Sequence, residues 1–265
     1  MTITLQPEAL PGHHIIGLES EHLNGGIVPW HKHIYAQLLY PAEGAVRVWA
    51  GGSVWMVHAS CALWLPPQMP HKFIATGNVL LKTILINEAQ SKIAGNRCFT
   101  TGISPLLREL LIAINQLTHQ QQYSPDSEQQ QRFSALETLI LQEIKAGGKV
   151  SLEIPWPRDM RLQLLCEELM NHPGYLPALD NLADKISVSS RTLMRIFVKE
   201  TGLTFRHWVQ QMHVISAVSL LEEGDSVAKI ARHLGYASAE SFGNMFKRRT
   251  GYSPGKYSTS IIIGQ

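Results

Sequence analysis

Three histidines in the first third of the chain have the residue type and spacing to bind a ligand through nitrogen atoms. His31 and His33 are separated by one residue, so on a β-strand both imidazoles would project from the same face. A third histidine, His71, follows the turn-forming pair Pro66-Pro67. Three imidazoles can hold zinc, iron or nickel. We therefore predict that His31, His33 and His71 form a site for a divalent metal ion or for a small molecule.

The residues around these histidines resemble the cupin pattern, in which a glycine, a His-x-His pair, an acidic ligand and a later histidine line a small β-barrel. Gly25, Gln37 and Gly44 occupy the matching positions around His31 and His33. One departure concerns the metal, because Gln37 stands where the family has its acidic ligand. A neutral amide replaces a carboxylate poorly, which weakens the binding of hard metal ions and removes the usual iron site.

Two interpretations of this barrel pocket follow. In the first, His31, His33 and His71 bind a divalent metal ion. In the second, a small organic effector binds there, with the three histidines and Gln37 as hydrogen-bonding partners and Trp49 as an aromatic wall. Further tryptophans lie in or beside the predicted strands and suit either an aromatic wall or an ordinary core: Trp30, Trp55 and Trp64.

Short strands separated by turn residues must position this pocket. Strands are predicted at residues 37–40, 45–49, 53–57 and 63–65, and the Gly51-Gly52 pair suits a two-residue hairpin turn. Several short strands at close spacing indicate a small barrel or sandwich. After residue 100 the apolar residues recur with a helical period instead.

Two leucine-rich stripes characterise this helical part. They lie at residues 106–117 and 133–144, and they can either cap the core of the barrel or pair with a second copy of the chain. The glycine pair at 147–148 and the segment Pro155-Trp156-Pro157 then mark a boundary. We therefore predict an α+β protein of two domains, with a barrel and helices before this boundary and an all-α domain after it.

Composition and charge exclude several classes of protein. The chain has 265 residues, 45% of them hydrophobic and 17% charged, which suits a packed core. The 23 Lys and Arg residues against 21 Asp and Glu give a formal net charge of +2, so the chain is not a histone-like polycation. Residues 1–156 carry 10 basic and 11 acidic side chains, whereas residues 157–258 carry 13 and 10. Neither a signal-peptide pattern nor a long apolar run occurs, so we expect a soluble cytoplasmic protein without membrane contact.

Two segments in the last hundred residues repeat one design. In each, a short helix, a three-residue turn and a longer helix follow one another, once over residues 179–200 and again over residues 227–250. This is the helix-turn-helix arrangement, which lays its second helix in the major groove of DNA. The predicted helices are residues 179–186, 190–200, 227–234 and 238–250.

Each second helix divides into an apolar face and a polar face. On the polar faces, Arg191 or Arg195 could donate two hydrogen bonds to guanine, Asn244 could pair with adenine, and Glu240 could accept from cytosine. Serines at the helix starts and a nearby lysine are placed to meet phosphate. The full set of predicted DNA-binding residues is Ser189, Ser190, Arg191, Thr192, Met194, Arg195, Ser238, Glu240, Ser241, Asn244 and Lys247.

The stretch from residue 179 to residue 257 resembles the DNA-binding domain of the AraC/XylS family of bacterial transcription regulators. The resemblance implies two helix-turn-helix units joined by a long helix, here at about residues 205–222, and a leading helix at 158–171. Such a linker would hold the two recognition helices on one DNA face, about 34 Å apart. The matching residues are Ser189, Arg191, Leu193, Arg195, Phe197, Gly202, Ile230, Ala231, Gly235, Tyr236, Phe242, Phe246, Lys247, Gly251, Tyr252, Pro254 and Tyr257.

Together these features predict a transcription regulator, an activator or a repressor, and not an enzyme. We expect a cupin-like sensor domain at 1–100, a helical dimerisation region at 101–147, a linker at 148–157 and a DNA-binding domain at 158–258. The expected partners are double-stranded DNA, a small-molecule effector, a second copy of the chain and RNA polymerase. The alternative is a metal-dependent cupin enzyme, an oxygenase or isomerase, that carries a DNA-binding domain. Gln37 counts against this alternative, because such catalysis normally uses the missing carboxylate.

Overall fold

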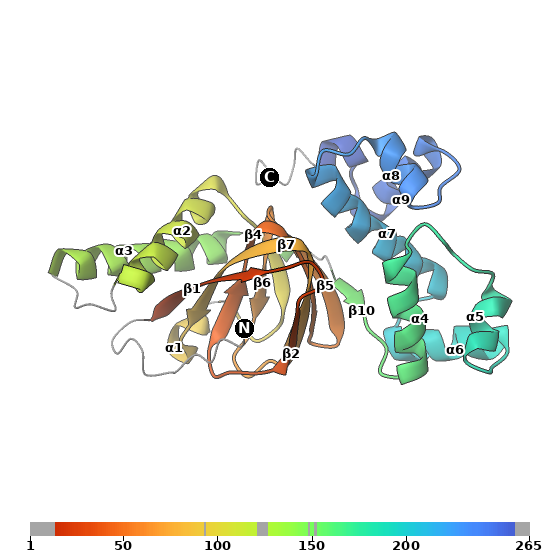
Figure 1. Cartoon of the computed structure of the whole chain (residues 1–265), viewed down its shortest axis with the longest axis horizontal. Helices are drawn as coiled ribbons and strands as arrows, with labels where there is room; N and C mark the ends of the chain where they lie inside the picture. Colours follow the sequence, from red (N-terminus) through yellow and green to blue (C-terminus); the bar gives the residue numbers. More distant parts are fainter. Residues whose placement is uncertain (1–13, 93, 121–126, 148, 151–152, 258–265) are drawn as a thin grey trace. The chain divides into compact units, whose positions relative to one another are not determined.

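The structure, a computed structural model, describes residues 14–92, 94–120, 127–147, 149–150 and 153–257. The chain separates into two compact units (Figure 1). Of the described residues, the first unit contains those up to 150 apart from 52–54, and the second contains 52–54 and 153–257. Among the helices that the structure describes, none has the length and apolar character needed to cross a bilayer.

The first unit is built on a curled antiparallel sheet, which confirms the predicted barrel-like fold (Figure 1). Its strands run in the order β5-β4-β7-β3-β6-β8-β9, and β1 and β2 also pair with β7. The long strand β7 therefore holds the sheet together, since four strands pair along it. The strands are β1 (Ile15–His22), β2 (Ile27–His31), β3 (Ala36–Leu39), β4 (Pro41–Ala50), β5 (Ser53–His58), β6 (Cys61–Leu65), β7 (His71–Ile86), β8 (Phe99–Gly102) and β9 (Lys149–Val150).

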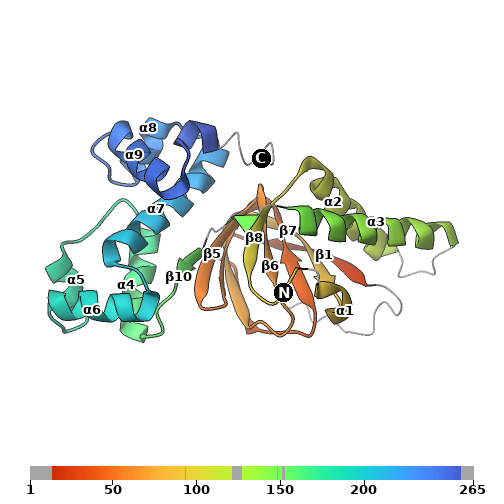
Figure 2. The ribbon, with the colours of Figure 1, turned by 180° about the vertical axis from the view of Figure 1, so that it is seen from behind.

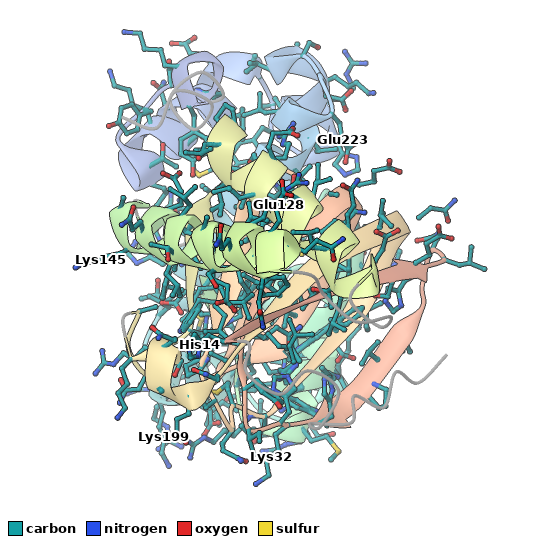
Figure 3. All side chains as sticks on the ribbon, turned by 90° about the vertical axis from the view of Figure 1, so that its left-hand side faces the viewer. His14, Lys32, Glu128, Lys145, Lys199 and Glu223 are labelled. Atoms are coloured by element: carbon teal, nitrogen blue, oxygen red, sulfur yellow. The ribbon has the colours of Figure 1, made fainter. Side chains whose placement is uncertain are left out.

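Helices α2 (Pro105–Gln120) and α3 (Ser127–Ala146) cover one face of this sheet (Figure 1). Figure 3 views the pair from outside, with Glu128 and Lys145 near the two ends of α3. The apolar stripes of both helices and one face of the strands form a single core. The predicted stripes thus cap the barrel, and the described residues between 101 and 147 belong to the first compact unit. A short helix, α1 (Glu88–Ser91), follows β7.

The strands alternate between this helix-covered face and the inside of the barrel. In β3, Ala36 and Leu38 belong to the core beneath α2 and α3. Gln37, which lies between them, must therefore point to the opposite face. A polar side chain is thus directed into the barrel, where it is only 8% exposed.

The approach of α2 to β1 depends on Gly17. A Cβ atom at this position would lie 2.6 Å from the Cα of Asn115, which is closer than real side chains come. The amide of Gly17 also donates to Oγ1 of Thr118, at 3.0 Å. Residues on α2 therefore fix both the position and the polar pairing of β1.

The second unit is an all-α bundle preceded by β10 (Glu153–Pro155). Figure 2 shows α5 and α6 at one end of α7 and α8 and α9 at the other. This arrangement confirms the predicted tandem helix-turn-helix fold. The helices are α4 (Met160–Asn171), α5 (Leu179–Lys185), α6 (Ser190–Thr201), α7 (Phe205–Glu222), α8 (Val227–His233) and α9 (Ala239–Thr250).

Part of the predicted linker at 148–157 forms regular secondary structure. Residues 153–155 form β10, and the main-chain oxygen of Pro155 accepts a 2.9 Å hydrogen bond from Nε1 of Trp208 on α7. The oxygen of Pro157 accepts another from Nε2 of Gln163. The C-terminal half of the predicted linker therefore hydrogen-bonds to the helical unit.

A buried carboxylate fixes the start of β1. Glu137 on α3 is 6% exposed, and its Oε1 accepts hydrogen bonds from the amides of His14 and Ile15, at 2.7 and 2.8 Å. We expect Glu137→Ala to lower the free energy of unfolding by about 2 kcal/mol, because both amides lose a charged acceptor. Urea denaturation of the full chain measures this change. The exposed Glu128→Ala on the same helix is the control and should change it by less than about 0.5 kcal/mol; equal effects would contradict this role.

Candidate effector and DNA-binding sites

The three predicted histidines lie together at one end of the barrel. His31 ends β2 and His71 begins β7, and the two residues are opposite each other in the β2–β7 register. His33 lies beyond the end of β2, so the prediction that one strand presents both His31 and His33 is wrong. The three rings nevertheless converge, and one ring nitrogen of each lies within 4.8 Å of the other two.

The Nδ1 atoms of all three rings face main-chain carbonyl oxygens. The Nδ1 atoms of His31 and His71 are each 2.8 Å from an oxygen, of Pro29 and Met69 respectively. That of His33 is 2.9 Å from the oxygen of Tyr35. A carbonyl oxygen only accepts, so each Nδ1 carries the ring proton. In the neutral rings, each Nε2 therefore keeps a free lone pair.

His71 is the most enclosed of the three. It is 1% exposed, and its Nε2 is buried without a hydrogen-bond partner among the described residues. Burial lowers the pKa of His71 to about 4, so its ring is neutral at physiological pH. A buried nitrogen with a free lone pair is suited to accept a hydrogen bond or to bind a metal ion.

Gln37 contacts this cluster directly. Its Oε1 lies 2.9 Å from Nε2 of His33. Since Nδ1 of His33 carries the ring proton, Nε2 is an acceptor, and a half-turn of the Gln37 amide would present an N–H group to it. Gln37, which the sequence pattern placed in the site, therefore lies in hydrogen-bonding distance of His33.

The tryptophans do not line this site. Trp49 is opposite Lys72 in the β4–β7 register, and Ala50 is opposite His71, so the ring of Trp49 lies on the other face of the sheet from His71. The ammonium group of Lys72 lies 4.3 Å from the centre of the Trp49 ring and 5.8 Å from that of Trp30. The prediction that Trp49 forms an aromatic wall beside the histidines is therefore wrong.

The two remaining tryptophans are core residues. Trp64 is fully buried in the core beneath α2 and α3, and its Nε1 donates to the main-chain oxygen of Gly95. Trp55 is 3% exposed, and its Nε1 donates to the oxygen of Ala50. Both indole N–H groups are thus engaged by the sheet or its connections, as an ordinary core requires.

The two predicted recognition helices have matching local structure. Each has 12 residues, a serine N-cap and a glycine C-cap in the left-handed conformation. The hydroxyl of Ser189 accepts from the amide of Thr192 at 3.2 Å, and that of Ser238 accepts from the amide of Ser241 at 3.1 Å. Both capping serines therefore use their hydroxyls to start the helices, and their amides remain at the exposed helix N-termini.

Helix α6 presents two unpaired arginines. Arg191 and Arg195 are exposed, and neither side chain has a hydrogen bond or ion pair with any residue that the structure describes. Thr192 and Met194 are half-buried beside them. Ser190 differs, because its hydroxyl donates to the carboxylate of Asp180 on α5 and so joins the two helices of this unit.

Helix α9 presents a more mixed surface. Four predicted DNA-binding side chains on it are exposed, while Phe242, Met245 and Phe246 are buried on its opposite face. Its last turn also carries Arg248, whose Nε is 3.3 Å from the main-chain oxygen of Asn244. Sequence analysis did not select Arg248, although three successive basic residues near a helix end were a visible signal. The four exposed residues are Glu240, Ser241, Asn244 and Lys247.

A buried histidine on α7 joins the connection between α4 and α5 to the turn of the second helix-turn-helix unit, and sequence analysis had not selected it. Nε2 of His213 on α7 lies 2.9 Å from the main-chain oxygen of Pro173, before α5, and Nδ1 lies 3.0 Å from the hydroxyl of Tyr236, after α8. At the same place, a Cβ atom on Gly235 would lie 2.5 Å from the oxygen of Gly174. The connection between α4 and α5 therefore meets the turn of the second unit at His213.

Comparisons with known proteins identify both parts of the chain. Residues 14–154 match the AraC-like ligand binding domain, and residues 182–260 match a helix-turn-helix domain. The transcriptional regulator NimR of Escherichia coli K12 is 33% identical over 229 residues, which are 86% of this chain and 81% of that protein. The transcriptional activator RhaS of Citrobacter koseri is 25% identical over 85% of this chain and 86% of that protein.

Among solved structures, unsaturated fatty acid-bound ToxT from Vibrio cholerae strain SCE256 aligns with 98% of this chain and 99% of that one. The TM-score is 0.38 and the identity is 13%.

The barrel with its ligand-binding family match and the tandem helix-turn-helix define a ligand-responsive DNA-binding protein. The chain belongs to the AraC family of transcriptional regulators.

The contacts of His213 predict how stability depends on pH. Burial lowers the pKa of His213, so the folded chain holds the neutral ring more strongly than the unfolded chain does. In the unfolded chain His213 has the ordinary histidine pKa of about 6.5, so below this pH the unfolded chain binds more protons than the folded chain. The contribution of His213 to stability is therefore lost as the pH falls from about 6.5 through the lower pKa of the folded state.

Urea denaturation from pH 7.5 to pH 5 measures this dependence. His71 contributes in the same direction, so the comparison must be between variants. We expect the free energy of unfolding of His213→Gln to fall less steeply with decreasing pH than that of the wild type. His207→Gln, an exposed position on the same helix, should leave the slope unchanged. Identical slopes for wild type and His213→Gln would contradict the prediction.

Proposed function

We propose that the chain regulates transcription by inserting α6 and α9 into successive major grooves, under the control of an effector bound beside His31, His33, Gln37 and His71. The observation that carries the first part is the pair of exposed, unpaired guanidinium groups of α6. Arginines that have no intramolecular partner can donate to guanine without first breaking an ion pair.

The spacing of the two helices supports binding to a single DNA face. Helix α7 has 18 residues and is therefore about 27 Å long. Contacts of His213, and the close approach of Gly174 and Gly235, also hold the second unit against the connection between α4 and α5. This length and rigidity suit two recognition helices about one helical turn of DNA apart.

The roles of individual residues follow from their surroundings. Arg191, Arg195 and Asn244 are suited to base edges, and Glu240 to a cytosine amino group. The main-chain amides at the helix N-termini capped by Ser189 and Ser238, together with Lys247, are suited to bind phosphate groups of DNA. Thr192, Met194 and Ser241 flank the base-reading residues. Ser190 is proposed to contact phosphate only through its amide, since its hydroxyl is engaged by Asp180.

The enzyme alternative receives less support than regulation. The relatives that match most of the chain are transcriptional regulators. In addition, Gln37 occupies the position of the acidic cupin ligand and contacts His33. Its amide has no proton to exchange at neutral pH. We therefore propose that the cluster binds an effector without turnover, and that an activating role would add RNA polymerase as a partner.

Substitution of Arg195 tests the base-reading assignment. Operators are first identified by genome-wide mapping of bound DNA. We expect Arg195→Ala to weaken operator binding by about 10-fold or more and to relax the preference at one base pair, because one bidentate contact is lost. Gel-shift titrations with operators substituted at each base measure both effects.

The matched control is Arg161→Ala. Arg161 is exposed on α4 and forms an ion pair with Asp159, outside both helix-turn-helix units. This variant should bind the operator with wild-type affinity and base preference. If Arg195→Ala lost affinity equally for every substituted operator, Arg195 would be a phosphate contact rather than a base contact.

We propose that two copies pair through the outer surface of α2 and α3. Leu106 is 50% exposed and Leu139 is 41% exposed, although both lie on helices whose other leucines are mostly buried. We expect Leu139→Lys to shift the mass measured by light scattering from that of a dimer to that of a monomer. The free energy of unfolding of the monomer should not change. The control is Glu128→Lys at the start of α3, and a dimeric Leu139→Lys protein would overturn the proposed surface.

A further inference from the structure

We propose that the two helix-turn-helix units divide the recognition of DNA between them. The α5–α6 unit discriminates between base sequences, and the α8–α9 unit supplies most of the attraction to the phosphate backbone. The inference rests on the proposed function, because it takes the insertion of α6 and α9 into DNA as given. It goes further in assigning base discrimination and phosphate anchoring to different units.

The two units can be compared position by position, because their frameworks match. Helices α5 and α8 have seven residues each, and Leu182 and Ile230 are buried at the fourth position of their helices. Helices α6 and α9 have 12 residues each, between a serine N-cap and a glycine C-cap, so residues 190–201 correspond to residues 239–250. A difference in charge at a matched exposed position is therefore a difference in what the two units present to DNA.

The α8–α9 unit is more basic than the α5–α6 unit. Residues 179–201 carry four Lys or Arg side chains and three Asp or Glu side chains, whereas residues 227–250 carry five and one. One lysine of each unit pairs with a carboxylate outside these ranges, Lys185 with Glu168 and Lys229 with Asp225. The charges that remain are balanced in the α5–α6 unit and strongly positive in the α8–α9 unit.

The supporting helices α5 and α8 differ in charge where DNA strands pass. In a helix-turn-helix, the first helix crosses the phosphate backbone. Asp180 and Asp184 lie one turn apart on α5, and both are exposed. The residues at the matching positions of α8 are Ala228 and Arg232, which are also exposed. A phosphate group is therefore repelled by the carboxylates of α5 and attracted by the guanidinium of α8.

The first two turns of the recognition helices differ in the opposite sense. These turns contact base edges, because the N-terminal part of a recognition helix enters the major groove. Helix α6 has Arg191 and Arg195 there, and each can donate two hydrogen bonds to guanine. At the matching positions, α9 has Glu240 and Asn244. The strongest base-reading groups therefore lie on α6.

The last turns of the recognition helices place positive charge on α9. Three successive basic residues end this helix, and all are exposed, whereas α6 has a single basic residue in the matching turn. Nη2 of Arg249 donates to the neutral Oε1 of Gln211 on α7, at 2.9 Å, so this contact does not cancel its charge. Cations at this end lie beyond the base-reading turns and are suited to phosphate. The matched residues are Lys247, Arg248 and Arg249 on α9 and Val198, Lys199 and Glu200 on α6.

Substitution of Arg232 tests the anchoring role of the α8–α9 unit. Fluorescence anisotropy measures the Kd of the full-length protein for a mapped operator and for a duplex of the same length and scrambled sequence, from about 50 to about 200 mM KCl. We expect Arg232→Gln to weaken binding to both duplexes by the same factor, about 3-fold or more. The slope of log affinity against log salt should fall by about 1, because one phosphate contact is lost.

The control is Arg161→Gln on α4, which removes the same charge outside both units and should leave the slope unchanged. An unchanged slope for Arg232→Gln would overturn the anchoring role of α8.

Asp184→Arg provides a gain-of-function test. This variant gives α5 the residue that α8 has at the matching position, so a new cation should meet the phosphate backbone. We expect it to bind the scrambled duplex about 3-fold or more tightly than the wild type and to steepen the salt dependence by about 1. Position 184 is exposed, so the test stands even if Arg232→Gln fails to fold. An unchanged slope for Asp184→Arg would overturn the proposed difference between the supporting helices.

The matched variants Arg195→Ala and Asn244→Ala test the discriminating role of the α5–α6 unit. The readout is the ratio of operator affinity to scrambled-duplex affinity. Arg195→Ala should lower this ratio by about 10-fold or more, and Asn244→Ala by less than about 3-fold. Equal losses would overturn the division between the units and leave the proposed function intact. A wild-type protein that bound the mapped operators no more tightly than the scrambled duplex would instead overturn the proposed function.

Discussion

Burial of one face of the curled sheet beneath α2 and α3 decides which side chains can reach the inside of the barrel. Once Ala36 and Leu38 pack against the helices, the strand period directs Gln37 to the other face. Along β7, the register with β4 separates His71 from Lys72 in the same way. The face that carries Gln37 and His71 and the face that carries the contact between Lys72 and Trp49 are therefore opposite sides of one sheet, and exchanging them would need a shift of register.

In the helical unit, the long helix α7 connects two similar helix-turn-helix units. Both units use a serine N-cap and a glycine C-cap, so each recognition helix begins and ends independently of the other. A single long helix could still allow their relative rotation. The close approach of Gly174 to Gly235, and the hydrogen bonds of His213 on both sides, hold the second unit against the connection between α4 and α5.

Much of the fold could be predicted because its signals are local. The bounds of α7, at Phe205–Glu222, agree with the 205–222 that the resemblance to the AraC/XylS family implied. The strands β3 to β6 were found from the turn residues that separate them along the chain. The sequence misled where long-range pairing decides the outcome. His33 lies outside β2, Trp49 faces away from His71, and β10 turns part of a Pro-rich linker into a strand.

The sequence by itself determined the two halves of this protein, the spacing of its histidines and the polar face of each recognition helix, because helix periods, turn residues and motif spacings are written along the chain. Only the tertiary structure decided that three carbonyl oxygens orient the three imidazoles and that Nε2 of His71 is buried without a partner. It also decided that His213 joins residues 40 positions before it and 23 after it. The physical reason is that hydrogen-bond partners and burial depend on which segments meet in space, and the spacing of residues along one strand or helix does not contain that information.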